Sequence, residues 1–128
     1  MSSLPIRRLQ FFTIRTKNLE TARRFYVDDL GFPIMNEKAG EYFQVAIAGV
    51  PLCVDLSTGN APTQANQIGI EVTDLDTTIA MLRKKGFVVR EGARVEGAER
   101  WVAINDPDGH ELIFIARSIP SGTFTENT

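Results

Sequence analysis

The sequence has one cysteine and one histidine among its 128 residues. A single cysteine excludes an internal disulfide and cannot build a thiolate-rich zinc site. Its neighbours Leu52 and Val54 favour a buried strand position for Cys53 and hence an inert thiol, with a reactive thiol as the alternative. Neither a disulfide nor a thiolate-rich zinc site therefore stabilises this chain.

An excess of charge of one sign is also missing. Fourteen Lys and Arg stand against sixteen Asp and Glu, for a net charge of −2. Nucleic-acid binding normally leaves a basic footprint, and no such footprint is visible. No apolar run approaches the roughly 20 residues of a membrane span, and the N-terminus lacks the apolar core of a secretory signal. We expect a cytoplasmic protein without nucleic-acid or membrane partners.

The sequence does contain an internal repeat. The segments FFTIRTKNLETARRFYVDDLGF (11–32) and QIGIEVTDLDTTIAMLRKKGF (67–87) share a pattern at an offset of 56 positions. Each begins with the period-2 alternation of a half-buried strand. Asn18 and Asp74 then stand as helix N-caps before an amphipathic stripe, and Gly31 and Gly86 stand as C-cap residues. Each segment therefore predicts a strand followed by a helix.

Three shorter strands are expected after each helix, which gives two β-α-β-β-β units in a single domain. The expected strands are Phe32–Asn36, Glu41–Ala48 and Leu52–Leu56, and then Val88–Arg90, Arg100–Ile104 and Glu111–Ala116. Unit one covers about residues 6–57, a polar linker 58–65, unit two about 66–117 and a tail 118–128. Residues 91–99 are expected to form a charged loop.

A duplicated β-α-β-β-β unit with DPDG before its last strand resembles the vicinal oxygen chelate superfamily, which includes glyoxalase I, extradiol dioxygenases and fosfomycin- and bleomycin-resistance proteins. The most specific segments are NLETARRFYVDDLGF (18–32) and INDPDGHELIFIA (104–116), and the similarity spans residues 6–117. The resemblance implies an α+β fold in which both units form a curved, mixed eight-stranded sheet around a pocket, with helices on the outer face. It also implies a homodimer.

The metal-dependent members of that superfamily hold their ligands in the first and last strands of each unit. The matching positions here are Phe11, Gln67 and Ile113, with either Cys53 or Asp55 in the last strand of unit one. Two of these residues, Phe11 and Ile113, have no donor atom, whereas a divalent ion usually needs three or four ligands. We expect no metal cofactor, and the weak candidate ligands are Gln67 and Asp55.

The segment INDPDGHEL (104–112) carries the only histidine. Pro107 and Gly109 suit a tight turn that Asp106 can cap. If Ile113 occupies the concave face, as the resemblance implies, strand alternation places Glu111 and Ile115 there too and turns His110 away from it. We expect a turn-flanking, partly exposed histidine, with a catalytic base or ligand as the alternative. A Ser–His–acid arrangement, a phosphate loop and a dinucleotide fingerprint are not found.

Strand alternation also nominates residues for the concave face. The candidate ligand-binding residues are Phe11, Thr13, Arg15, Gln67, Glu71, Trp101 and Ile113. Arg15 and Glu71 are equivalent under the repeat, and form either an arginine clamp for an anionic ligand or an ion pair at the sheet rim. The aromatic residues Trp101, Tyr42 and Phe43 of the third strands either stack against a ligand or pack in the core.

Three hypotheses for function follow. The first is a metal-free small-molecule-binding protein that resembles the bleomycin-resistance branch. The second is an enzyme, either a metal-dependent lyase or dioxygenase, or a metal-free isomerase with Glu71 as the base. The third is a structural or regulatory dimerisation module. We favour the first, because the family's ligand positions are occupied by Phe11, Gln67 and Ile113.

Overall fold

A computed structural model describes residues 4–57, 65–93 and 100–116 of the chain. The chain divides into two compact units, Met1–Gln64 and Ala65–Thr128. Of the predicted linker 58–65 only Ala65 is described, and the predicted tail 118–128 lies outside the described residues. The predicted loop 91–99 is described only up to residue 93, where it belongs to a strand.

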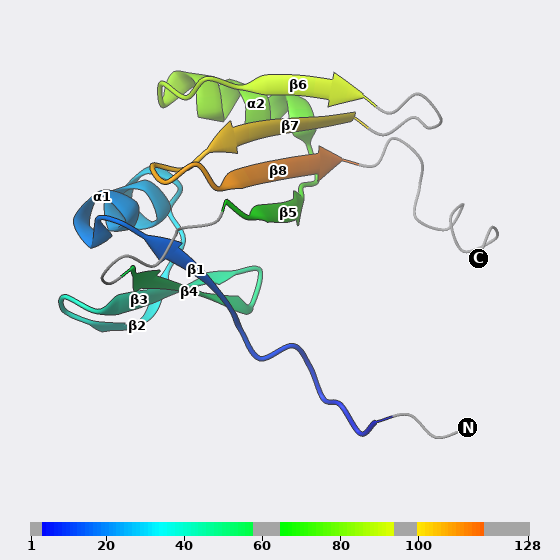
Figure 1. Cartoon of the computed structure of the whole chain (residues 1–128). Helices are drawn as coiled ribbons and strands as arrows, with labels where there is room; N and C mark the ends of the chain where they lie inside the picture. The colour runs from blue at the N-terminus through cyan, green and yellow to red at the C-terminus, as the bar shows by residue number, and fades with distance from the viewer. Residues whose placement is uncertain (1–3, 58–64, 94–99, 117–128) are drawn as a thin grey trace. The chain divides into compact units, whose positions relative to one another are not determined.

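The first unit is a four-stranded mixed sheet with one helical segment. Its elements are β1 (Phe12–Thr16), α1 (Leu19–Arg23), the π-helical turn η1 (Arg24–Asp29), β2 (Ile34–Lys38), β3 (Tyr42–Ile47) and β4 (Val50–Leu56). The strand order is β1-β4-β3-β2, with β1 parallel to β4 and the other neighbours antiparallel (Figure 1). The polypeptide thus follows the predicted β-α-β-β-β course.

The second unit repeats this topology. Its elements are β5 (Gln67–Glu71), α2 (Leu75–Lys84), β6 (Arg90–Ala93), β7 (Arg100–Asn105) and β8 (Glu111–Ala116). The strand order β5-β8-β7-β6 is that of the first unit with each strand replaced by its counterpart. The predicted α+β fold of two tandem β-α-β-β-β units is therefore confirmed, with four strands in each of two mixed sheets.

Two strands that follow a helical segment begin two residues later than predicted, β2 at Ile34 and β6 at Arg90. The backbone N–H of Phe32 donates to the Tyr26 carbonyl at 3.1 Å, so Phe32 closes the helical segment and β2 starts at Ile34. The N–H of Phe87 donates to the Leu82 carbonyl in the same way, and β6 starts only at Arg90. Phe32, which was predicted to begin a strand, thus completes the helical segment instead.

Both predicted N-caps are confirmed. The Asn18 side-chain oxygen accepts the backbone N–H of Thr21, and the Asp74 carboxylate accepts that of Thr77, each at 3.0 Å. The N-cap bond satisfies one of the free N–H groups of the first helical turn. Gly31 and Gly86 follow the helical segments with φ of 76° and 92°, a left-handed conformation that glycine adopts without strain.

The Asp74 cap predicts that wild type and the Asp74→Asn variant differ in how their stability depends on pH. The Thr77 N–H stabilises the carboxylate and holds the pKa of Asp74 below its ordinary value of 3.8. A lowered native pKa contributes stability above the ordinary pKa, and this contribution is lost as pH falls through the lowered one. We expect wild type to be more stable than Asp74→Asn near neutral pH and this advantage to vanish in acid, as measured by urea unfolding. A pH-independent difference would contradict the assignment.

The core of each unit lies between its helical segment and one face of its sheet. In unit two this layer is built from alternate strand residues and from the apolar stripe of α2: Ile68, Leu75, Ile79, Leu82, Val102, Ile104, Leu112 and Phe114, all buried. The remaining strand residues project from the opposite side of the sheet, which we call the open face. No helix among the described residues is long and apolar enough to cross a membrane.

Candidate functional site

The open face of the second sheet is organised in three cross-strand rows. The register places Gln67 opposite Glu111 and Glu111 opposite Asn105, which form the polar row. The middle row consists of Gly69, Ile113, Ala103 and Arg90. The last row consists of Glu71, Ile115, Trp101 and Gly92. The face is therefore polar at one end and aromatic at the other.

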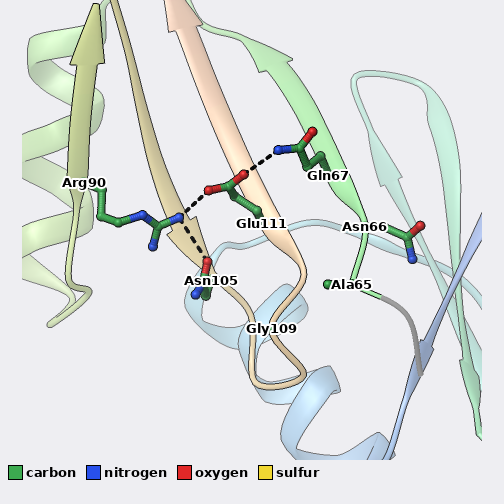
Figure 2. A pocket seen from close by; sticks show the side chains of 7 residues that line it. All are labelled: Ala65, Asn66, Gln67, Arg90, Asn105, Gly109 and Glu111. Carbon is green, nitrogen blue, oxygen red and sulfur yellow. Dashed lines mark hydrogen bonds and ion pairs between the residues drawn. The ribbon is translucent and has the colours of Figure 1, made fainter. Parts of the chain in front are cut away.

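Hydrogen bonds tie the polar row to Arg90 on the neighbouring strand. The Gln67 amide nitrogen donates to one Glu111 carboxylate oxygen at 2.8 Å, and the Arg90 guanidinium donates to the other. Arg90 also donates to the Asn105 side-chain oxygen at 3.1 Å. Figure 2 shows these four side chains, which come from β5, β8, β6 and β7 and which we call the polar cluster.

The polar cluster lines a hollow of about 820 Å³. The other lining residues are Ala65, Asn66 and Gly109, at the start of β5 and in the turn before β8 (Figure 2). This volume lies within the range of small-molecule sites in proteins, which hold a few placed polar groups. The hollow is therefore the candidate binding site of unit two.

The polar cluster keeps Glu111 ionised. The hydrogen bond from Gln67 and then that from Arg90 hold the pKa of the Glu111 carboxyl below its ordinary value, against a smaller opposing effect of burial. The positive charge of Arg90 and the negative charge of Glu111 thus balance within the site. A ligand that enters the hollow meets both donors and acceptors but little net charge.

The DPDG segment positions Glu111 through a turn, as the sequence predicts. The Asp106 carboxylate accepts the backbone N–H groups of Asp108 at 2.9 Å and of His110 at 2.8 Å. Gly109 has a φ of 88°, the left-handed conformation that the turn requires. The chain then enters β8 with Glu111 on the open face.

The expectation that His110 is partly exposed is wrong. The side chain is fully buried, and its Nδ1 accepts the backbone N–H of Asn66 at 3.0 Å. The carbonyl of Asn66 accepts the N–H of Glu111 at 2.8 Å, so the start of β5 is bound twice to the start of β8. His110 does not line the hollow. It holds together the two strand ends that carry Gln67 and Glu111.

The predicted site residues of unit two lie on one face. Gln67 and Glu71 are the first and last residues of β5 and are exposed, and Ile113 lies in the middle row. Trp101 is half-buried in the last row, opposite Ile115. Only Gln67 lines the hollow. The other three share its sheet face, and their roles in binding stay predictions.

The predicted site residues of unit one lie at β1. Phe11 precedes the strand and is 53% exposed, and Thr13 and Arg15 are exposed within it. They belong to a different unit from Glu71, so the Arg15–Glu71 pair stays a prediction.

The strand register decides between the two candidate positions in the last strand of unit one. Thr13 pairs with Cys53, as its repeat counterpart Gly69 pairs with Ile113. Cys53, rather than Asp55, therefore corresponds to Ile113. Cys53 is buried, as expected, and its Sγ accepts a hydrogen bond from the Gln44 amide at 3.0 Å.

The aromatic residues of the third strands have different surroundings. Phe43 packs in the core of unit one, 2% exposed, which confirms the packing interpretation for that residue. Tyr42 and Trp101 are half-buried counterparts, since Tyr42 pairs with Asp55 and Trp101 with Ile115. The Trp101 ring lies directly over Gly92, where a β-carbon would stand 2.2 Å from it. Trp101 alone keeps an aromatic surface next to the middle row of the second sheet.

Sequence reasoning missed three of the four residues of the polar cluster as site residues. Alternation did place Glu111 on the concave face, but the resemblance singled out Ile113, which stands at the family's ligand position four residues after Gly109. Arg90 and Asn105 could be found only from the antiparallel register, in which Arg90 pairs with Ala103 and Asn105 with Glu111. The pattern that would have indicated the polar cluster is a polar residue at the same end of each of four neighbouring strands.

Two tandem β-α-β-β-β units with a polar hollow on one open sheet face define a duplicated α+β protein with a candidate small-molecule site. The family model of the Glyoxalase/Bleomycin resistance protein/Dioxygenase superfamily matches residues 8–114, and the chain belongs to this superfamily. No curated protein matches the sequence at a significant level.

Solved structures share the fold at low sequence identity. The lactoylglutathione lyase of Agrobacterium tumefaciens is 16% identical with a TM-score of 0.75, over 88% of this chain and 96% of that one. TnmS3, an antibiotic-binding protein from Streptomyces sp. CB03234, is 24% identical with a TM-score of 0.74, over 91% and 100%. A glyoxalase/bleomycin resistance protein/dioxygenase from Alicyclobacillus acidocaldarius is 20% identical with a TM-score of 0.70, over 86% and 92%. These likenesses show the fold alone.

The residues at the family's metal-ligand positions do not fit a divalent ion. Phe11 and Ile113 have no donor atom, and the buried Cys53 thiol accepts a hydrogen bond from Gln44. The Gln67 amide donates to Glu111, whose other oxygen accepts from the cationic Arg90. The Arg90 guanidinium lies against the Glu111 carboxylate and would repel a metal cation that approached it. Within residues 4–57, 65–93 and 100–116, no three His, Cys, Asp or Glu side chains gather as a metal site.

Proposed function

We propose that this chain is a small-molecule-binding protein of its superfamily that binds its ligand without the family's metal ion. The observation that carries the proposal is the polar cluster. Gln67, which stands at one of the family's ligand positions, forms a hydrogen bond with Glu111, and Glu111 forms an ion pair with Arg90. The positive charge at this site is that of the Arg90 side chain, which is paired with Glu111.

The surroundings of the polar cluster suit a small organic ligand. The hollow of about 820 Å³ lies at the polar row. Gly69 and Ile113, which present little polar surface, are in the next row of the same sheet face, and Trp101 is one row further. Polar groups at one end fix orientation, while apolar and aromatic surface supplies contact area. The likeness in fold to TnmS3, an antibiotic-binding protein, is compatible with such a role. A cytoplasmic location and a homodimer stay predictions.

Ligand-induced stabilisation in the presence of a chelator tests the proposal. The melting temperature of the protein in EDTA is measured against a panel of small aromatic and heteroaromatic compounds. A ligand that binds only the native state stabilises it by about 2.7 kcal/mol at a hundred times its Kd. We expect at least one compound to raise the melting temperature progressively with concentration.

A matched pair of variants locates the binding. Ile113→Lys places a charge in the middle row and is expected to abolish the ligand-induced shift. Met81→Lys makes the same kind of change on the exposed side of α2, where Met81 is 56% exposed, and should leave the shift intact. A panel without any shift in EDTA, or shifts that appear only with added divalent metal, would contradict the proposal.

A further inference from the structure

We infer that the polar cluster selects ligands whose polar end is a neutral group with an adjacent hydrogen-bond donor and acceptor, such as a carboxamide, lactam or urea, carried on a flat aromatic body. This inference rests on the proposed function and adds the chemical class of the ligand. It is carried by the charge balance of the cluster and by the three rows of the open face.

The charge balance disfavours ionised ligand groups. Arg90 and Glu111 form an ion pair at the edge of the hollow, and Glu111 is the less exposed partner, with 27% of its side chain accessible. A ligand carboxylate that pairs with Arg90 would also be repelled by Glu111, and a ligand ammonium that pairs with Glu111 would also be repelled by Arg90, so neither gains a net charge attraction. A neutral group avoids both penalties and keeps its hydrogen bonds.

The same two side chains present a donor and an acceptor next to each other. An ionised carboxylate has about four lone-pair sites and a guanidinium has five N–H groups. Gln67 and Arg90 use one site on each Glu111 oxygen, and Arg90 uses one nitrogen, Nη2, for Glu111 and Asn105. An amide group can therefore donate its N–H to Glu111 and accept from Arg90 with its carbonyl oxygen. This pair of hydrogen bonds requires that the ligand group has both a donor and an acceptor.

The rows beyond the cluster fit a flat apolar body. The middle row offers Gly69 and Ile113, and the last row offers the ring of Trp101. Successive rows on one face are two residues apart, or about 6.6 Å, so the polar row and Trp101 are separated by roughly 13 Å. A two-ring aromatic system with an amide substituent is shorter than this distance. Its ring then lies on Ile113, one row from Trp101.

Trp101 makes the inference directly measurable, because it is the only tryptophan of the chain. The probes are naphthalene-2-carboxamide and naphthalene-2-carboxylate, which differ only in the charge and donor of the head group. Both are titrated at pH 7 and followed by Trp101 fluorescence. We expect the carboxamide to bind at least about tenfold more tightly, which is about 1.4 kcal/mol.

Glu111→Gln should reverse this preference, because it leaves the charge of Arg90 unbalanced and removes the repulsion of the carboxylate. Glu37→Gln is the matched control, since it removes the carboxylate of another Arg–Glu pair, Arg23–Glu37 on the first unit, at 3.1 Å. The control should keep the preference of wild type. Retention of the carboxamide preference in Glu111→Gln would overturn the inference.

The wild-type result is decisive even if Glu111→Gln does not fold. Equal or tighter binding of the carboxylate to wild type would overturn the inference and leave small-molecule binding in place. Binding of neither naphthalene compound, with other compounds still raising the melting temperature, would also overturn the inference alone. A panel in which no compound at all stabilises the protein would overturn the proposed function with it.

Discussion

Replacing His110 with alanine is expected to lower the free energy of unfolding by about 3 kcal/mol or more, because two penalties add. Removing a fully buried ring leaves a cavity, and the Asn66 N–H loses its acceptor Nδ1. Because this bond joins the start of β5 to the start of β8, the variant should also weaken ligand binding at Gln67 and Glu111. Urea unfolding followed by circular dichroism measures the first effect, and Trp101 fluorescence titration the second.

His110→Phe separates the two penalties. Phenylalanine fills the space of the ring but forms none of the hydrogen bonds of the imidazole, so its expected cost is the loss of these bonds without a cavity, about 1–3 kcal/mol for the unsatisfied Asn66 N–H. His110→Ala should therefore be the less stable of the two. Wild-type stability in His110→Phe would contradict the assignment of the Asn66 hydrogen bond to the imidazole.

Gly92→Ala is expected to displace Trp101 and to destabilise the protein by about 1–3 kcal/mol, the usual cost of overfilling a packed site. The added methyl group would stand 2.2 Å from the indole ring, well inside van der Waals contact, so the ring must move. A shift in the emission maximum of the single tryptophan reports its new surroundings. Loss of the aromatic end of the open face should also weaken binding of the naphthalene probes.

Gly69→Ala is the control on the same sheet face. Nothing lies within 4 Å of a β-carbon at Gly69, and its φ is not positive. Alanine costs less backbone entropy than glycine in a strand, so this variant should be as stable as wild type or slightly more stable. A clear destabilisation of Gly69→Ala, or none in Gly92→Ala, would contradict the arrangement of the open face.

Most of the fold could be predicted from local patterns. The alternation in 67–71, the Asp74 cap and Gly86 each specify one step of the chain, and the repeat transfers the same steps to unit one. The start of β2 was less predictable, because Phe32 is an apolar residue that suits a strand and a helix end equally well. Its backbone N–H goes to the preceding helical segment, which no side-chain pattern reveals.

The site was less predictable than the fold because it depends on register. Gln67 and the face of Ile113 follow from alternation within single strands. The contact of Arg90 with Glu111 needs β6, β7 and β8 to pair in one particular alignment, across two hairpins. The burial of His110 depends on Asn66, which lies 44 residues earlier in the chain. Neither of these two long-range contacts can be deduced from a local sequence pattern.

The central claim is that this chain binds its ligand through Arg90, Glu111 and Gln67 and without the family's metal ion. Elemental analysis of the pure protein, with Zn, Ni, Mn and Fe quantified per chain before and after incubation with each ion, tests it most directly. We expect metal far below one equivalent per chain in every case, with ligand binding unchanged by EDTA. Near-stoichiometric metal in the wild-type protein that is lost in Gln67→Ala would contradict the claim and indicate a metal-dependent member of the superfamily.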